Sequence, residues 1–234
     1  SYGGGVCQVS TTLYNAVLKA ELEVTQRSNH SMIVTYVKPS MDAAIAGDYK
    51  DLKFVNNLDA PIYIEGYTVG KDIYFNIYGQ ETRPSNRKVT YESEVVSEED
   101  PGTQFVATGD AVGSISTTQG KHMGYVARLW KIVTVDGVEQ SRDAINKSTY
   151  KSSPKIVNVG TASADPNATA AVNAALATGD EATIYATVAQ YSGAGQTPAE
   201  TPAETPADGS AEAAAILGTV DESQITENTT TEGQ

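Results

Sequence analysis

The chain divides into a part that can bury a core and a C-terminal part that cannot, and this division limits the fold more than any other feature. Three tandem Thr-Pro-Ala-Glu/Asp repeats occupy positions 197–208, in a stretch that has no aromatic residue after Tyr191. All 16 lysine and arginine residues lie before position 161, whereas 11 of the 29 acidic residues follow it. Acidic, repetitive sequence of this kind does not bury enough apolar surface to fold. We therefore predict a disordered tail over residues 193–234.

The formal net charge of -13 belongs mainly to that tail. The first 160 residues carry 16 basic and 18 acidic side chains, so they offer no basic surface for nucleic acid, which we exclude as a partner. A single cysteine excludes an internal disulfide framework and a multi-cysteine metal site. We expect neither a metal nor a cofactor.

Residues 1–82 predict an α+β fragment with one helix and a small antiparallel sheet. Apolar residues at helical spacing over 6–20 predict an amphipathic helix that follows three glycines. Short strand-like runs at 32–37, 51–56, 61–67 and 71–78 are separated by turn residues. Because the chain begins inside what reads as a loop entering the helix, we expect natural sequence to precede it.

Residues 83–161 predict an elongated all-β domain after a linker that contains Pro84. Alternating runs at 88–96 and 125–135 lead through turns, and Asp136-Gly137 is a hairpin signal before the run at 138–146. A further strand is expected at 154–159. Trp130 is expected in the core of this domain. Residues 162–192 are rich in alanine and predict a short helical extension interrupted at 178–180.

Cys7 is the residue with the sharpest chemistry. It lies between Gly5 and the first helical turns, where unpaired amides and the helix dipole stabilise a thiolate. Gly4 and Gly5 allow backbone conformations that are closed to other residues, so that a substrate carbonyl can approach amides acting as an oxyanion hole. Ser10 could cap or line the same end of the helix.

His30 is the candidate base, because it is the only imidazole in the first domain and a cysteine nucleophile needs one. It stands in a polar stretch between Arg27 and Ser31, which are candidate substrate-binding residues together with Asp42. Asp42 or Asp48 could orient the ring through its other nitrogen. The plain alternatives are a cysteine that packs as a small apolar residue and carboxylates that make turn hydrogen bonds.

The run Gly-Gly-Gly-Val-Cys-Gln-Val-Ser-Thr-Thr-Leu-Tyr-Asn-Ala at 3–16, with His30-Ser31 and Asp42-Ala43, resembles the C-terminal part of the VanW-like domain family. The resemblance covers about residues 1–80 and includes positions 54–57 and 61–64. Residues 87–161 resemble the G5 domain that often follows VanW-like segments in cell-wall proteins. The positions where that thin β module would want glycines are Gly120, Gly124, Gly137 and Gly160.

These resemblances imply an extracellular protein of the bacterial cell envelope or wall, with peptidoglycan stem peptides or glycan as partners. Any membrane anchor would belong to an upstream segment. Some VanW-like proteins have been proposed to be L,D-transpeptidases, and on that model Cys7 attacks the carbonyl after a diamino acid in a stem tetrapeptide, with His30 as base. Two alternatives stay open: a noncatalytic wall-binding module in which Cys7 packs behind the glycine turn, and a mechanical stalk.

Overall fold

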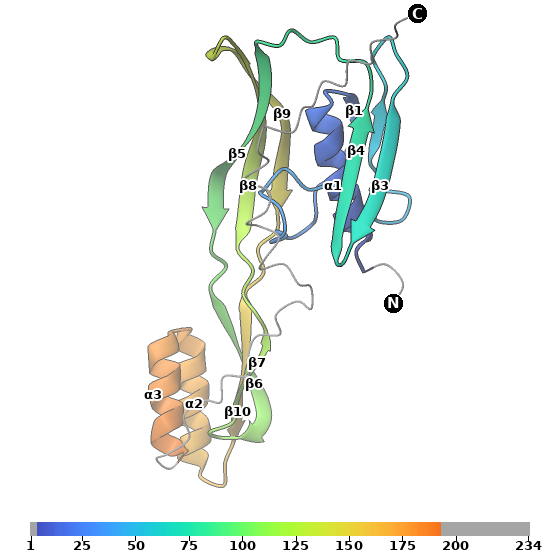
Figure 1. Ribbon diagram of the computed structural model, residues 1–234. Helices are drawn as coiled ribbons and strands as arrows, with labels where there is room; N and C mark the ends of the chain where they lie inside the picture. The colour runs from blue at the N-terminus through green and yellow to red at the C-terminus, as the bar shows by residue number, and fades with distance from the viewer. Residues whose placement is uncertain (1–3, 193–234) are drawn as a thin grey trace, which may run out of the picture.

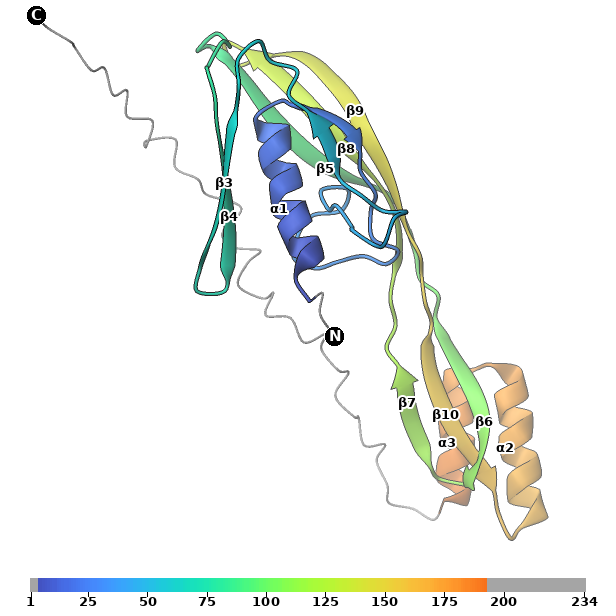
Figure 2. The same cartoon turned by 90° about the vertical axis from the view of Figure 1, so that its right-hand side faces the viewer.

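The computed structural model describes residues 4–192, so the predicted disordered tail lies outside the described part. The described chain is elongated (Figures 1 and 2). A helix and two small sheets lie beside the long strands at one end, and a pair of helices lies against the strands at the other end. The predicted fold class, an α+β region followed by an all-β domain and a helical extension, is confirmed.

The first region is built around helix α1 (Val6–Lys19), which begins after Gly5 and buries Tyr14, Val17 and Leu18. Strand β1 (Glu23–Gln26) pairs antiparallel with β2 (Lys53–Val55), and β3 (Tyr63–Val69) forms a hairpin with β4 (Asp72–Tyr78). The predicted sheet is therefore two separate two-stranded sheets.

One strand of the first region was expected in the wrong place. Residues 32–37 form bends and loop, not a strand, and the partner of β2 is the unanticipated β1. The reason is that a strand needs a neighbouring ladder. Residues 32–37 lead instead into the buried turn at Ser40, whose φ is 66°, and pair with no strand of the described chain.

The all-β region contains two three-stranded sheets, one above the other in Figure 1. The upper sheet has the order β5 (Arg87–Glu99), β8 (Gly124–Val135), β9 (Val138–Tyr150), and both pairings are antiparallel. The lower sheet has the order β6 (Thr103–Ala111), β10 (Lys155–Ala162), β7 (Ile115–Gln119), in which β10 is parallel to β6 and antiparallel to β7. The predicted hairpin joins β8 to β9 through Asp136 and Gly137, which have φ values of 53° and 78°.

Helices α2 (Pro166–Thr178) and α3 (Glu181–Tyr191) cover the lower sheet. The break between them falls at Gly179, which has a φ of 68° that favours glycine. Their buried side chains, among them Val172 and Ile184, pack against Val157 and Val159 of β10 in one apolar core. The extension therefore shares an apolar core with the lower sheet.

A second core joins the first region to the upper sheet. Tyr14, Leu18 and Ala43 of the first region pack against Leu129 of β8, and all four are buried. The Tyr91 hydroxyl on β5 donates a hydrogen bond of 2.5 Å to the Leu18 carbonyl. The two regions therefore share one core and meet along a buried surface.

Trp130 lies outside that core, contrary to expectation. Because neighbouring residues of a strand face opposite sides of the sheet, Trp130 points away from the side where Leu129 is buried. It is half-buried, and its indole N–H donates a hydrogen bond of 2.6 Å to Glu94.

Candidate functional site

The candidate site is built on the segment from Arg27 to Ile45, which runs between α1 and strand β9. This segment has little regular secondary structure, so side chains satisfy much of its polar backbone. Its centre is the carboxylate of Asp42, which has no exposed surface.

Both oxygens of the Asp42 carboxylate are held by donors. Oδ1 accepts from the Arg27 guanidinium at 2.6 Å and from the Tyr150 hydroxyl at 2.5 Å. Oδ2 accepts from the backbone N–H and from Nδ1 of His30, both at 2.7 Å. Burial alone would raise the pKa of Asp42, but the hydrogen bonds from His30 and the charge of Arg27 outweigh it and hold the pKa below its usual value. Asp42 is therefore an ionised carboxylate in the interior.

His30 is oriented by that carboxylate. Since ionised Asp42 only accepts hydrogen bonds, we assign the proton of the neutral ring to Nδ1, which leaves Nε2 as an acceptor. Nε2 lies 3.4 Å from the Tyr36 hydroxyl, and 18% of the His30 side chain is exposed. The ring thus has one nitrogen fixed in the interior by Asp42 and the other beside the Tyr36 hydroxyl near the surface. Asp48, the other candidate partner, is exposed and does not take part.

Cys7 lies on the first turn of α1 and is half-buried. Its thiol donates to the carbonyl of Ile45, with Sγ and O separated by 3.6 Å. In the described part of the chain no hydrogen bond joins this thiol to His30. Cys7 contacts Ile45, and His30 contacts Asp42. Because Asp42 and Ile45 are three residues apart, both side chains contact the same loop.

The first turns of α1 are fastened to the same loop. Ser10 is buried, and its hydroxyl lies 2.5 Å from the Ala43 carbonyl, while Thr11 accepts from the Ala43 N–H at 3.0 Å. Ser10 therefore positions the helix against the loop, with its hydroxyl turned into the protein.

The glycines before the helix have a conformational role. Gly5 is the N-cap of α1 with a φ of 100°, and in the part of the chain that the structure describes no side chain caps the helix. A Cβ built on Gly4 or Gly5 would meet no atom within 4 Å. Among the described residues, the space around Gly4 and Gly5 is therefore open, and backbone amides begin the helix without a side-chain cap from Gly5.

Arg27 and Ser31 take different places. Arg27 is buried: it bonds the Asp42 carboxylate and the Ser148 hydroxyl at 2.8 Å, and its guanidinium lies 5.7 Å from the centre of the Tyr14 ring. It is thus an internal counter-ion of Asp42. Ser31 is exposed, and its carbonyl accepts from the Lys151 N–H at 2.7 Å.

Three residues of this site escaped sequence reasoning. On β9, Tyr150 donates to Asp42, and Ser148 accepts from Arg27. Ser40 joins these two residues of β9: its N–H donates to the Tyr150 hydroxyl and its hydroxyl to the Ser148 hydroxyl, each at 2.8 Å. Ser40 and Ser148 are almost fully buried. Alternation along β9 places Ser148 and Tyr150 on the same face, but only the folded structure shows that this face is buried.

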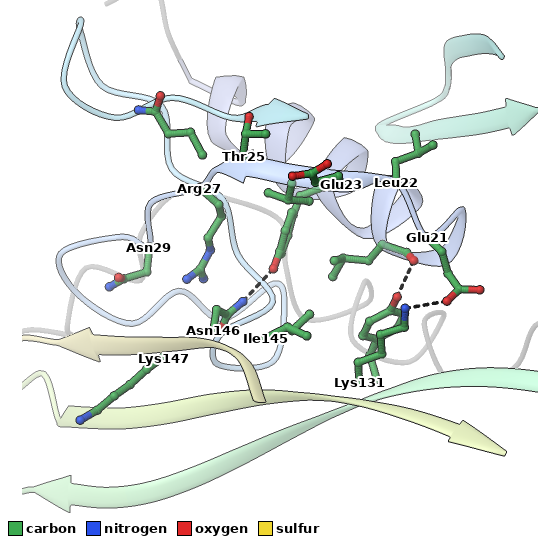
Figure 3. A pocket seen from close by; sticks show the side chains of 15 residues that line it. Glu21, Leu22, Glu23, Thr25, Arg27, Asn29, Lys131, Ile145, Asn146 and Lys147 are labelled. Carbon is green, nitrogen blue, oxygen red and sulfur yellow. Dashed lines mark hydrogen bonds and ion pairs between the residues drawn. The ribbon is translucent and has the colours of Figure 1, made fainter. Parts of the chain in front are cut away.

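A cleft of about 480 Å³ opens between the two regions beside Arg27 and Asn29 (Figure 3). Strand β1 and the end of α1 form one wall, and β8 and β9 form the other. The hydrogen bond of 2.7 Å from Asn146 to the Tyr14 hydroxyl crosses the cleft, and the Lys131–Glu21 ion pair lies at its other end. Two pairs of the side chains that line the cleft are therefore engaged with each other, one near each end.

No group of three or more His, Cys, Asp or Glu side chains in residues 4–192 is arranged to hold a metal ion. No helix among the described residues has the length and apolar character needed to cross a membrane.

Comparison with known proteins matches the two regions separately. Residues 1–78 match the family described as VanW like protein, and residues 81–162 match the G5 domain. Over 79 residues the chain is 39% identical to protein YoaR of Bacillus subtilis (strain 168), a match that covers 34% of this chain and 26% of that protein. The chain thus spans about a quarter of that relative.

Two solved structures are also similar in part. The IgA1 protease G5 domain is 26% identical, with a TM-score of 0.24, and the match covers 33% of this chain and 94% of that one. The crystal structure of HP0197-G5 is 20% identical, with a TM-score of 0.18, over 31% of this chain and 99% of that one.

Proposed function

We propose that this chain, which is a VanW-like region followed by a G5 domain, belongs to a cell-wall-associated, extracytoplasmic protein that modifies peptidoglycan by acyl transfer. In this proposal Cys7 is the nucleophile and His30 the general base. The acyl donor is a stem peptide, and the acceptor is an amine or, for hydrolysis, water.

The buried Asp42–His30 pair is the observation that carries the proposal. Keeping a carboxylate ionised without solvent costs several kcal/mol unless donors compensate it. Here four hydrogen bonds do so, and two of them come from His30 itself. A histidine that serves only as a loop residue does not need a buried, fully hydrogen-bonded carboxylate beside its ring. A general base does, because it must hold one tautomer and one orientation.

The chemistry would proceed through a thioester. In this proposal the Cys7 thiol first turns away from the Ile45 carbonyl toward His30. His30 Nε2 then takes the thiol proton as Sγ bonds to the peptide carbonyl carbon, and amides at the start of α1 stabilise the oxyanion. The C–N bond to the terminal D-alanine then breaks, and its nitrogen receives the proton from His30. An amine attacks the thioester next, His30 removes its proton, and Sγ leaves to be protonated again. No external oxidant, reductant or cofactor enters this sequence.

The test is a transfer assay on the full-length protein. Wild type and Cys7→Ala are incubated with tetrapeptide-bearing wall fragments, and mass spectrometry follows D-alanine release and cross-linked product. We expect product from wild type and none from Cys7→Ala, and a loss of at least about 100-fold for His30→Gln, as is typical for a general base. Equal product from wild type and Cys7→Ala would eliminate the nucleophile.

A second candidate function, noncatalytic wall binding, is favoured by the outer face of the β3–β4 hairpin. Two cross-strand pairs of tyrosines stack there with ring centres 6.1 and 5.2 Å apart. Between them Glu65 accepts hydrogen bonds from Tyr78 at 3.0 Å and Asn76 at 3.1 Å. Exposed aromatic faces beside polar groups suit the apolar faces and hydroxyls of sugar rings. The tyrosines are Tyr63, Tyr67, Tyr74 and Tyr78, and between 38% and 64% of each is exposed.

Co-sedimentation with purified peptidoglycan tests this second function. The double variant Tyr67→Ser/Tyr74→Ser removes one stacked pair, and Tyr49→Ser is the matched control because Tyr49 is 75% exposed outside the hairpin. If the hairpin binds glycan, the double variant sediments less with the wall and the control is unchanged. Equal sedimentation of wild type and both variants would exclude the Tyr67–Tyr74 pair as a glycan contact.

A further inference from the structure

The upper sheet of the G5 domain contributes directly to the Asp42 site. Strand β9 lies against the segment that carries His30: the Asn29 side chain donates to the Thr149 carbonyl at 2.9 Å, and the Lys151 N–H donates to the Ser31 carbonyl at 2.7 Å. Between these contacts β9 directs Tyr150 inward, where it is 2% exposed. The donor that reaches Asp42 from the G5 domain is 108 residues away in sequence.

We propose that Tyr150 is a positioning residue that fixes the Asp42 carboxylate and thereby the tautomer and orientation of His30, so that the base of the VanW-like region is complete only when the G5 sheet is docked. This inference rests on the proposed role of His30 and extends it to a residue of the second domain. It assigns the G5 domain a part in the chemistry besides wall attachment.

The hydrogen bonds of Tyr150 leave its hydroxyl one orientation. The oxygen accepts the N–H of Ser40 at 2.8 Å, so the single hydroxyl proton is left for Asp42 Oδ1. Burial, together with the nearby Asp42 charge, raises the pKa of Tyr150 to about 12, which keeps the hydroxyl protonated and donating.

The geometry of Asp42 explains why this donor matters to His30. A carboxylate moves as one rigid group, so a donor that fixes Oδ1 also fixes the position of Oδ2, which receives His30 Nδ1. Arg27 alone would leave Oδ1 with one side-chain donor. Tyr150 also draws negative charge toward Oδ1 and away from the ring, because a hydrogen bond to a carboxylate stabilises its charge locally.

The experiment compares Tyr150→Phe with Tyr91→Phe in the full-length protein. Tyr91 is the matched control because its hydroxyl also links the G5 sheet to the VanW-like region, through the Leu18 carbonyl, without contacting Asp42. The readout is the ¹⁵N chemical shifts of the His30 ring across a pH titration. These shifts report the tautomer and the titration midpoint without requiring turnover.

For Tyr150→Phe we expect a mixed tautomer population and a midpoint raised by about half a pH unit or more, because more of the Asp42 charge then faces the imidazolium. Tyr91→Phe should keep the wild-type values. Replacing Tyr150 by 3-fluorotyrosine, a stronger donor of nearly the same shape, should shift the midpoint in the opposite direction. General damage to the fold would not produce shifts of opposite sign.

Wild-type shifts in both Tyr150 replacements would overturn the proposal. If Tyr150→Phe does not fold, the 3-fluorotyrosine protein decides alone, and an unchanged midpoint refutes the positioning role. Because the titration needs no substrate, it also separates this inference from the proposed function. Absence of acyl transfer in wild type would refute the proposed function and leave the titration result standing.

Discussion

Replacing Glu21 by Gln should weaken the contact between the two regions in a manner that depends on pH. Glu21 follows α1, and its side chain is 11% exposed. Its carboxylate contacts Arg87 at 2.5 Å, Lys131 at 2.6 Å and Arg83 at 3.3 Å, three cations of the linker and upper sheet. These hydrogen bonds, that of Arg87 first, lower the pKa of Glu21 from 4.5 to about 2.

The magnitude follows from that pKa. A fall from 4.5 to about 2 corresponds at most to about 3 kcal/mol of stabilisation at neutral pH. The cations are partly exposed, with 24% to 40% of their side chains accessible, so solvent screening reduces the value. We expect Glu21→Gln to lower the free energy of unfolding by about 1–2 kcal/mol at pH 7.

The direction of the pH dependence is fixed by the lowered pKa. A carboxyl group whose folded pKa lies below its unfolded pKa stabilises the fold fully above the unfolded value. The contribution of Glu21 is therefore complete above about pH 4.5 and is lost as the pH falls toward 2. At pH 3 the difference between wild type and variant should be less than half of its value at pH 7.

Urea unfolding of both proteins, followed by circular dichroism at pH 7 and pH 3, measures this difference. The control is Glu139→Gln, because Glu139 pairs with Arg142 on the exposed surface of the same sheet, with side chains 45% and 39% accessible. Its effect should stay within about 0.5 kcal/mol. An equal loss for Glu21→Gln at both pH values would refute the electrostatic reasoning.

Three further substitutions test the core, the strand packing and the site. Leu129→Ala should cost about 2–5 kcal/mol in urea unfolding by leaving a cavity in the shared core, and a loss below 1 kcal/mol would contradict that packing. Gly160→Ala should open the β6–β10 pairing, seen as faster hydrogen exchange in β10, because the new Cβ overlaps a β6 carbonyl; unchanged exchange would count against it. Asp42→Asn should lower the free energy of unfolding by about 3–5 kcal/mol, because it leaves the buried Arg27 charge unpaired. Asp48→Asn should leave it unchanged, and equal stabilities of the two variants would exclude a buried ion pair.

Local signals in the sequence were enough to predict the elements with strong turn or cap chemistry. The Asp136-Gly137 dipeptide predicted the hairpin between β8 and β9, and Gly179 predicted the break between α2 and α3. Helix α1 was predicted within one residue of its observed end. Each of these features depends on residues a few positions apart.

Features that depend on distant residues could not be predicted. Strand β1 was missed because its identity comes from pairing with β2, about 30 residues later, more than from its own four residues. Tyr150 was missed because its alternating strand shows a buried face only once the opposite surface is known. For the partner of His30 there was a usable signal: Asp42 is flanked by Met41 and two alanines, which favour burial, and Asp48 follows a turn glycine.

The exchange of strand order between the two sheets has a consequence for a chain under tension. Three continuous paths, β5 to β6, β7 to β8 and β9 to β10, run along the long axis in Figures 1 and 2. The central strand is β8 in the upper sheet and β10 in the lower sheet, so a different path is central in each sheet. A force applied along that axis lies perpendicular to the hydrogen bonds between the paths, so these bonds share the load and must break together. The two sheets should therefore separate by shear between their strands only at high force.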